Sequence, residues 1–206
     1  MERISPFQAT LSNDETAQLP AAQFGGEIVV VDQPEQIEAA CEELGREAVI
    51  GFDTETRPSF KAGVHYRVSL LQLSTPKRCF LFRLCRIPLD KPILRLLENP
   101  KVKKVGAAVH GDLSGLKELR HFREAGFVDL QQIVSEWGIE EKSIRKMSAL
   151  VLGKRVSKAQ RLSNWEAASL TPQQQMYAAT DAWVCGCIYE KLNNTPKINT
   201  QKSKRA

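Results

Sequence analysis

Apolar residues along this chain fall into short runs whose spacing alternates between that of strands and that of helices. Five runs have the length and composition of buried strands. These runs cover residues 27–32, 48–56, 68–75, 78–84 and 103–109. Pro76 and Lys77 separate the third run from the fourth, which predicts a hairpin between the two.

Helical spacing fills the intervals between the runs and takes over in the second half of the chain. The predicted helices cover residues 34–44, 93–97, 111–122, 131–138, 143–153 and a long final segment. Thr171, Pro172 and Gln174 fix the start of the final helix, because they form the sequence pattern of a capping box with Pro in the first turn. A basic and largely irregular connection, residues 153–170, precedes it. The first half of the chain is rich in strands and the second half is mostly helical. This order predicts an α/β domain with a mixed sheet, flanked by helices.

The composition fits one globular domain with a mild basic bias. The 206 residues are enough to bury a core, and 42% hydrophobic and 26% charged residues are ordinary proportions. A net charge of +5 and a pI of about 9.0 suit a polyanionic partner without requiring one. The pattern predicts a flexible N-terminal arm over residues 1–25, a folded domain over 26–194 and a basic disordered tail over 195–206.

The cysteines and the apolar runs exclude several classes of protein. Five scattered cysteines without a CxxC pair predict buried, reduced thiols and offer neither a disulfide framework nor a zinc site. A helix that spans a bilayer needs about 20 apolar residues, and no segment approaches this length. The N-terminus also lacks the apolar stretch of a signal peptide. We therefore expect a soluble, cytoplasmic protein with no membrane partner.

Two carboxylates, Asp53 and Glu55, lie near the end of the second predicted strand. Side chains alternate along a strand, so both point to the same face. Neighbouring anions at the edge of a core repel each other and lose solvation, and a hard divalent cation is the usual compensation. A solvated strand end is the alternative that these two residues leave open.

Asp112 lies where the fifth predicted strand gives way to a helix. Asp is favoured at helix starts, so an N-terminal cap explains it as well as a functional role does. Ligands of open α/β sheets, however, bind at the ends of strands, where Asp112 also lies.

Tyr177 and Asp181 are four residues apart in the final helix and therefore share one of its faces. The nearby Ala178, Ala179 and Ala182 are small, which allows this helix to approach the sheet closely. A hydrogen-bonded surface pair is the alternative for Tyr177 and Asp181 taken alone.

The segments IGFDTE, VGAAVHGDLSGL and SNWEAASLTPQQQMYAATDA together resemble the three motifs of the DEDD exonuclease superfamily, in its tyrosine-bearing DEDDy branch. Ribonuclease D and the exonuclease domain of the Werner-syndrome helicase are similar over residues 27–193. The resemblance implies a ribonuclease H-like fold. It also implies that the chain carries a complete set of catalytic residues, namely Asp53, Glu55, Asp112, Tyr177 and Asp181.

The resemblance further implies a 3′–5′ exonuclease that uses two divalent ions and releases nucleoside 5′-monophosphates from the free 3′ end of DNA or RNA. Ligands that are all oxygen suit Mg²⁺ or Mn²⁺. We expect Asp53 to bridge the ions, Glu55 and Asp181 to complete one shell, and Asp112 to hold the second ion through water. A free phenol has a pKa of about 10 and is a poor base at neutral pH. Tyr177 is therefore expected to orient the attacking water rather than to accept its proton.

Contacts with the substrate are predicted from basic and aromatic residues in two loops. A basic stretch before the third motif could bind phosphates or could be a solvated loop, and it contains Lys154, Arg155, Lys158 and Arg161. Phe60 and Tyr66, in the loop after the first motif, could stack on a terminal base or simply pack. Trp165 is expected to pack under the final helix.

Several functional questions stay open at the level of sequence. Ribonuclease D carries helical substrate-binding modules beyond its nuclease domain, whereas this sequence ends soon after the final helix. No motif announces a contact with a 2′-hydroxyl, so the choice between RNA and DNA is open, as is the oligomeric state. The alternatives to an exonuclease are a catalytically silent nucleic-acid-binding module of the same fold and an endonuclease of the same broad fold.

Overall fold

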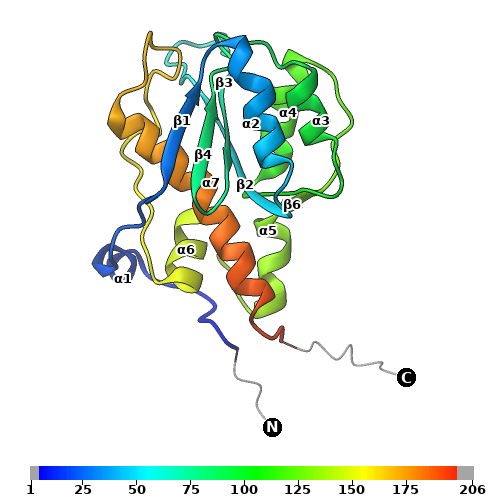
Figure 1. Ribbon diagram of the computed structural model, residues 1–206. Coiled ribbons are helices and arrows are strands. Elements are labelled where there is room, and N and C mark those ends of the chain that lie inside the picture. The colour runs from blue at the N-terminus through cyan, green and yellow to red at the C-terminus, as the bar shows by residue number, and fades with distance from the viewer. Residues whose placement is uncertain (1–4, 199–206) are drawn as a thin grey trace.

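A six-stranded mixed sheet lies between two layers of helices in the computed structural model, which describes residues 5–198 (Figure 1). The strands are β1 (Glu27–Val31), β2 (Val49–Thr56), β3 (Val68–Ser74), β4 (Arg78–Phe82), β5 (Lys103–Gly106) and β6 (Phe127–Asp129). The helices are α1 (Asn13–Gln18), η1 (Pro34–Gln36), α2 (Ile37–Leu44), α3 (Lys91–Leu97), α4 (Val109–Leu119), α5 (Leu130–Ile133), η2 (Val134–Trp137), α6 (Ile144–Leu152) and α7 (Pro172–Asn193).

The strand order is β1-β4-β3-β2-β5-β6, and β3 runs antiparallel to both of its neighbours. The other pairs are parallel, so β1, β4, β2, β5 and β6 all end at the same edge of the sheet. The predicted hairpin of β3 and β4 is confirmed, as is the mixed character of the sheet. The short β6 was not predicted, because three residues give too little pattern to recognise.

The two faces of the sheet are covered by different helices (Figure 1). On one face α2, α3 and α4 bury an aliphatic and aromatic core that includes Phe52 and Phe82. On the other face α7 crosses the sheet, and α5, η2 and α6 pack against its C-terminal half. The predicted capping box starts α7, with Thr171 Oγ1 accepting from Gln174 N and the Gln174 side chain from Thr171 N.

The helix α7 and strand β2 approach each other unusually closely at Gly51. A Cβ atom added at Gly51 would lie 1.8 Å from the carbonyl oxygen of Ala182, so only glycine is tolerated there without a backbone shift. Ala182 and its neighbours Ala178 and Ala179 are fully buried, which confirms the predicted close packing of this helix. As a result, the residues that follow Gly51 in β2 lie directly beside α7.

Strand β2 extends beyond β5 at the edge where the parallel strands end. Only Val49, Ile50 and Gly51 pair with β5, which itself ends at Gly106. The outer half of β2, residues 53–56, therefore has no strand on that side. Helix α4 follows β5 after two residues, so its first turn lies next to this gap.

The N-terminal segment is attached to the domain, contrary to the prediction of a flexible arm over residues 1–25. Within it, Ser12 caps α1, the Ala22 N–H donates to the Arg155 carbonyl at 2.8 Å, and Phe24 is only 2% exposed. The hydrogen bond between Ala22 and Arg155 joins residues more than 100 positions apart, and no local pattern in the sequence reveals it. Residues 1–4 lie outside the described residues.

The beginning of the predicted C-terminal tail is also attached. The Trp137 indole N–H donates to the Thr195 carbonyl at 2.8 Å, and the Ile198 N–H donates to the Glu136 carbonyl at 3.0 Å. Residues 199–206 lie outside the described residues. In residues 5–198 we find no helix that combines the length and the apolar character needed to cross a membrane.

All five cysteines are free, in agreement with the prediction, but they are not all buried. Cys85 is exposed and Cys187 half-buried, whereas the remaining three are enclosed.

Trp165 is 0% exposed and packs beside Tyr177 with ring centroids 6.0 Å apart, which confirms its predicted place under the final helix.

Candidate active site

Three carboxylates meet between β2 and α7. Phe52 belongs to the core under α4, so the alternation along β2 turns Asp53 and Glu55 toward α7. Asp181 comes from α7, where its side chain is buried. One oxygen from each of these three carboxylates lies within 4.8 Å of the others.

Asp112 reaches the site from the other side of the gap beside β2. It lies in the first turn of α4, whose N-cap is Ala108, so the alternative reading of Asp112 as the cap is wrong. The Thr54 hydroxyl donates to Asp112 Oδ1 at 2.5 Å and fixes this side chain against β2. Asp112 lies outside the group of three but close enough for its charge to act on Asp53 and Glu55. We call Asp53, Glu55, Asp112 and Asp181 the acidic cluster.

Burial and mutual repulsion disfavour ionisation throughout the acidic cluster. Burial raises the pKa of Asp53 well above its usual range, and the charges of Asp181, Asp112 and Glu55 raise it further. For Glu55, burial and then the charges of Asp181 and Asp112 raise the pKa to about 9. Burial raises the pKa of Asp181 to about 7 and that of Asp112 to about 6. The cluster is therefore a place where a positive charge would be strongly stabilised.

The donor set of the cluster fits divalent metal ions. Its ligands are all carboxylate oxygens, which hard cations such as Mg²⁺ and Mn²⁺ prefer. None of the four carboxylates forms a salt bridge with a described Lys, Arg or His residue. In addition, Asp181 Oδ1 is buried and has no hydrogen-bond partner within residues 5–198. A buried carboxylate oxygen without a partner is costly, and a bound cation would offset that cost.

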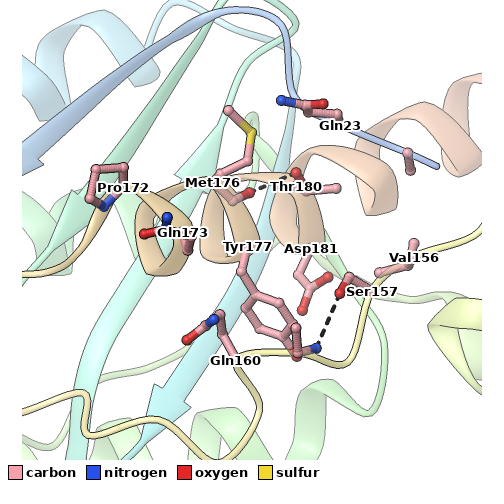
Figure 2. A pocket seen from close by; sticks show the side chains of 12 residues that line it. Gln23, Val156, Ser157, Gln160, Pro172, Gln173, Met176, Tyr177, Thr180 and Asp181 are labelled. Carbon is pink, nitrogen blue, oxygen red and sulfur yellow. Dashed lines mark hydrogen bonds between the residues drawn. The ribbon is translucent and has the colours of Figure 1, made fainter.

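Tyr177 lies one turn before Asp181 on the same face of α7, as predicted, and both line a pocket of about 510 Å³ (Figure 2). Burial raises the pKa of the Tyr177 phenol far above its usual value, and the charges of Asp181 and Glu55 and a hydrogen bond with Asp181 add to this rise. The phenol is therefore neutral at physiological pH and can donate a hydrogen bond. It is a very poor proton acceptor.

The pocket is bounded by segments that are distant in the sequence (Figure 2). The N-terminal segment contributes Ala22 and Gln23, and α7 contributes six residues that include Tyr177 and Asp181. The basic connection contributes Val156, Ser157, Ala159 and Gln160. Figure 2 shows Gln160 near the Tyr177 ring and Ser157 near Asp181. Asp181 thus connects the acidic cluster with a cavity that is large enough to admit part of a nucleotide.

The predicted substrate-contacting residues lie on loops outside the helices and strands. Lys158 and Arg161 are exposed in the basic connection, and Lys158 lies between two residues that line the pocket. Phe60 is 82% exposed. Tyr66 is half-buried, and the Arg57 guanidinium lies 4.6 Å from the centroid of its ring. One face of the Tyr66 ring is therefore occupied by Arg57.

Sequence reasoning missed two residues that hold the cluster in place. Side chains alternate along a strand, so Thr54 points to the opposite face from Asp53 and Glu55. The sequence therefore gave no reason to connect Thr54 with Asp112. Asp129 Oδ1 accepts from the N–H groups of Ala108 at 3.1 Å and of Gln131 at 2.9 Å. Among residues 5–198, Ala108 is the one non-glycine residue with a positive φ, 61°, and it starts the helix that carries Asp112. In the sequence, the only sign of a role for Asp129 was its position as an Asp at the strand end within FVDL.

Comparisons with known proteins point to a common family. The sequence profile of the 3′–5′ exonuclease family matches residues 28–196. The bifunctional 3′–5′ exonuclease/ATP-dependent helicase WRN of Mus musculus is 35% identical over 188 residues, which are 85% of this chain and 13% of the mouse protein. Exonuclease 3′-5′ domain-containing protein 2 of Drosophila melanogaster is 39% identical over 150 residues, 70% of this chain and 25% of that protein.

Solved structures share the fold. The EXO domain of Aedes aegypti Nibbler superimposes with a TM-score of 0.73 at 24% identity, over 82% of this chain and 88% of that chain. Escherichia coli RNase D gives 0.74 at 22% identity, over 82% and 44%. Trypanosoma brucei RNase D, solved in complex with RNA U12, gives 0.72 at 21% identity, over 91% and 67%. These likenesses confirm the ribonuclease H-like fold that the sequence predicted.

Proposed function

The chain belongs to the 3′–5′ exonuclease family, and we propose that it hydrolyses phosphodiester bonds one nucleotide at a time from the 3′ end of a nucleic acid strand. The observation that carries this proposal is the meeting of four carboxylates and one neutral phenol beside a pocket. A fold can be kept while a function is lost, so the proposal rests on these side chains and not on the fold.

Asp53, Glu55 and Asp181 would hold one divalent ion, and Asp53 with Asp112 a second, either Mg²⁺ or Mn²⁺ in both cases. Such ions stabilise negative charge on the attacking and leaving oxygens of a phosphodiester and lower the pKa of the attacking water. The chain contributes the fixed positions of the carboxylates. Strand β2 and helix α7 set three of them, and the Thr54 hydroxyl orients the fourth.

Tyr177 would donate a hydrogen bond that orients the attacking water or an oxygen of the scissile phosphate. The raised pKa of the phenol supports a donor and argues against a base, because deprotonating it beside Asp181 and Glu55 would bring further negative charge into the cluster. Trp165, packed beside the Tyr177 ring, restricts the orientations that this ring can adopt.

The proposed partner is a nucleic acid with a free 3′ end, held in part by the exposed Lys158 and Arg161 and by Phe60 and Tyr66. The chain spans 13% and 25% of the length of the curated relatives named above, so the substrates of those whole proteins are not carried over. Both RNA and DNA are included in the proposal. The cytoplasmic location stays a prediction from the sequence.

Digestion of matched RNA and DNA oligonucleotides tests this function. Single strands with a 5′ label, incubated with Mn²⁺ or Mg²⁺, should yield a ladder that descends one nucleotide at a time, and nucleoside 5′-monophosphates should be released. The same reaction in EDTA, and the variant Asp181→Asn, should leave the strands intact. The ratio of the initial rates on RNA and DNA then identifies the preferred substrate.

Circular single strands and a binding assay separate the two alternatives from the proposal. Cleavage of circles would identify an endonuclease. Binding of the labelled strand without cleavage at any metal concentration would identify a silent binding module. Either result would overturn the proposed function.

A further inference from the structure

Gln72 is a polar residue in the middle of the apolar strand β3. Its side chain is 0% exposed, and its neighbours along the strand, Leu71 and Leu73, are fully buried as well. Neither Nε2 nor Oε1 of its amide has a hydrogen-bond partner among the described residues. Most buried polar groups in folded proteins are hydrogen-bonded, and an unsatisfied buried amide destabilises the folded state. A leucine or methionine at this position would avoid that cost.

The register of the sheet places Gln72 opposite a residue of the acidic cluster. In the antiparallel pair of β2 and β3 its partner is Asp53, and in the pair of β3 and β4 its partner is Leu81. Directly opposite residues point to the same face of a sheet, with Cβ atoms about 4.5–5.5 Å apart. Gln72 therefore lies between an apolar side chain and a proposed metal ligand, on the face that α7 covers.

A second buried group without a partner lies in the same place. Asp181 Oδ1, which belongs to the carboxylate group that includes Asp53, also lacks a hydrogen bond. The unsatisfied amide of Gln72 and the unsatisfied oxygen of Asp181 thus flank Asp53 from β3 and from α7. Both are explained if the site is completed only when its carboxylates are ionised and bind a cation.

We propose that Gln72 is a positioning residue for Asp53, whose carboxylate accepts a hydrogen bond from the Gln72 Nε2–H when it is ionised and holds a divalent cation. The inference rests on the proposed function, because it takes Asp53 as a metal ligand. An ionised carboxylate only accepts hydrogen bonds, so the amide N–H is the group that matches it. Carboxylates that bind metals are commonly held by such a neighbour, and loss of the neighbour lowers metal affinity or activity by about 10- to 100-fold.

The variant Gln72→Met tests this role, because it keeps the length of the side chain and removes both amide atoms. We expect its melting temperature in EDTA to equal or exceed that of the wild type, since two unsatisfied polar atoms are lost. The Mn²⁺ dissociation constant, measured by calorimetric titration without substrate, should rise on the order of 10-fold or more. Metal affinity would then fall without a loss of stability, which a residue with only a packing role does not produce.

Leu81→Met is the matched control, because Leu81 is the other cross-strand neighbour of Gln72 on the same face. It changes the packing and leaves the amide in place, so its Mn²⁺ dissociation constant should match that of the wild type. Gln72→Leu repeats the test with a second side chain in case Gln72→Met does not fold. A dissociation constant for the Gln72 variants within twofold of the wild type would overturn the proposal, and so would an equal loss of affinity in Leu81→Met.

The titration and the digestion assay fail independently. Wild-type protein that binds Mn²⁺ but degrades no strand would overturn the proposed function and leave the effect of Gln72 on metal binding measurable. Wild-type protein that degrades strands, together with a Gln72→Met variant that binds Mn²⁺ normally, would overturn only the role of Gln72.

Discussion

The acidic cluster, through Asp181, and the basic connection both line one pocket, but they are built in different ways. The carboxylates project from β2, α4 and α7, which are regular elements packed into the core of the domain. The basic connection, residues 153–170, contains neither a helix nor a strand and exposes Lys158 and Arg161. Regular elements hold side chains to within a fraction of an ångström, whereas loops adapt to a partner. The difference suggests that the cluster performs the chemistry and the connection binds the strand.

The basic connection is anchored at its two ends and free between them. At its start the Arg155 N–H donates to the Pro20 carbonyl, and the Arg155 carbonyl accepts from the N-terminal segment. Toward its end the buried Arg83 guanidinium donates to the carbonyls of Ala167 and Ala168. Only residues 157–162, between these anchors, are free to follow a bound strand. Changes in the two regions should therefore affect different kinetic constants.

Asp53→Asn should produce the largest effect, because Asp53 is the residue assigned to both ions. We expect turnover to fall about 10³-fold or more. In EDTA at pH 8 the same variant should melt at a higher temperature than the wild type, because one source of repulsion in the cluster is removed. Stopped assays at saturating substrate and thermal unfolding measure the two quantities. Turnover above a tenth of the wild-type value would show that the acidic cluster does not carry the chemistry.

Tyr177→Phe should lower turnover by about 10²-fold, because it removes one oriented hydrogen bond while leaving all metal ligands in place. The Mn²⁺ dissociation constant and the Michaelis constant for the strand should stay within about threefold of the wild type. Single-turnover kinetics give the chemical step and calorimetry gives the metal affinity. If the loss appeared in the Michaelis constant instead, Tyr177 would belong with the basic connection as a binding residue.

Metal-free protein should lose stability as the pH rises. The folded-state pKa of Glu55, about 9, lies above its ordinary value of 4.5, so this group's contribution is fully present below about pH 4 and is lost progressively up to about pH 9. Asp181, with a pKa raised to about 7, adds to the loss over the lower part of this range. In EDTA the melting temperature should therefore fall by about 3 °C or more between pH 5 and pH 9.

Millimolar Mg²⁺ should weaken or reverse this trend, because the ion binds the ionised carboxylates and favours them in the folded state. In EDTA the melting temperature of Asp53→Asn should fall less steeply with pH, because this variant loses part of the repulsion. A melting temperature in EDTA that does not depend on pH over this range would contradict the assignment of raised pKa values to the cluster.

The same contrast explains what the sequence could predict. Asp53, Glu55, Tyr177 and Asp181 lie on regular elements with periods of two and 3.6 residues, so their common faces follow from spacing alone. Their convergence does not follow from spacing. It depends on the close approach of α7 to Gly51 and on the unequal lengths of β2 and β5.

Contacts between distant segments were beyond the reach of the sequence. Nothing local reveals that the segment before Gly25 attaches to the basic connection, or that Thr54 bonds to Asp112 across the gap beside β2. Gln72 was visible as a polar residue in an apolar run, but its position opposite Asp53 depends on the register of the hairpin. Local pattern thus predicted most of the elements and the candidate metal ligands, and tertiary contacts supplied the residues that hold those side chains.

The double variant Lys158→Gln/Arg161→Gln should produce the smallest effect, and it tests the proposed division between the two regions most directly. We expect the Michaelis constant for a single strand to rise severalfold while turnover at saturation stays unchanged. If both residues contact phosphates, the dependence of log affinity on log salt should weaken by about 1.4, since each contact with a single strand contributes about 0.7. Lys101→Gln removes an exposed charge next to the N-terminal end of β5, away from the cluster, and should change neither quantity. A fall in turnover in the double variant would show that the basic connection takes part in the chemistry, because weaker binding of the strand is overcome at saturation.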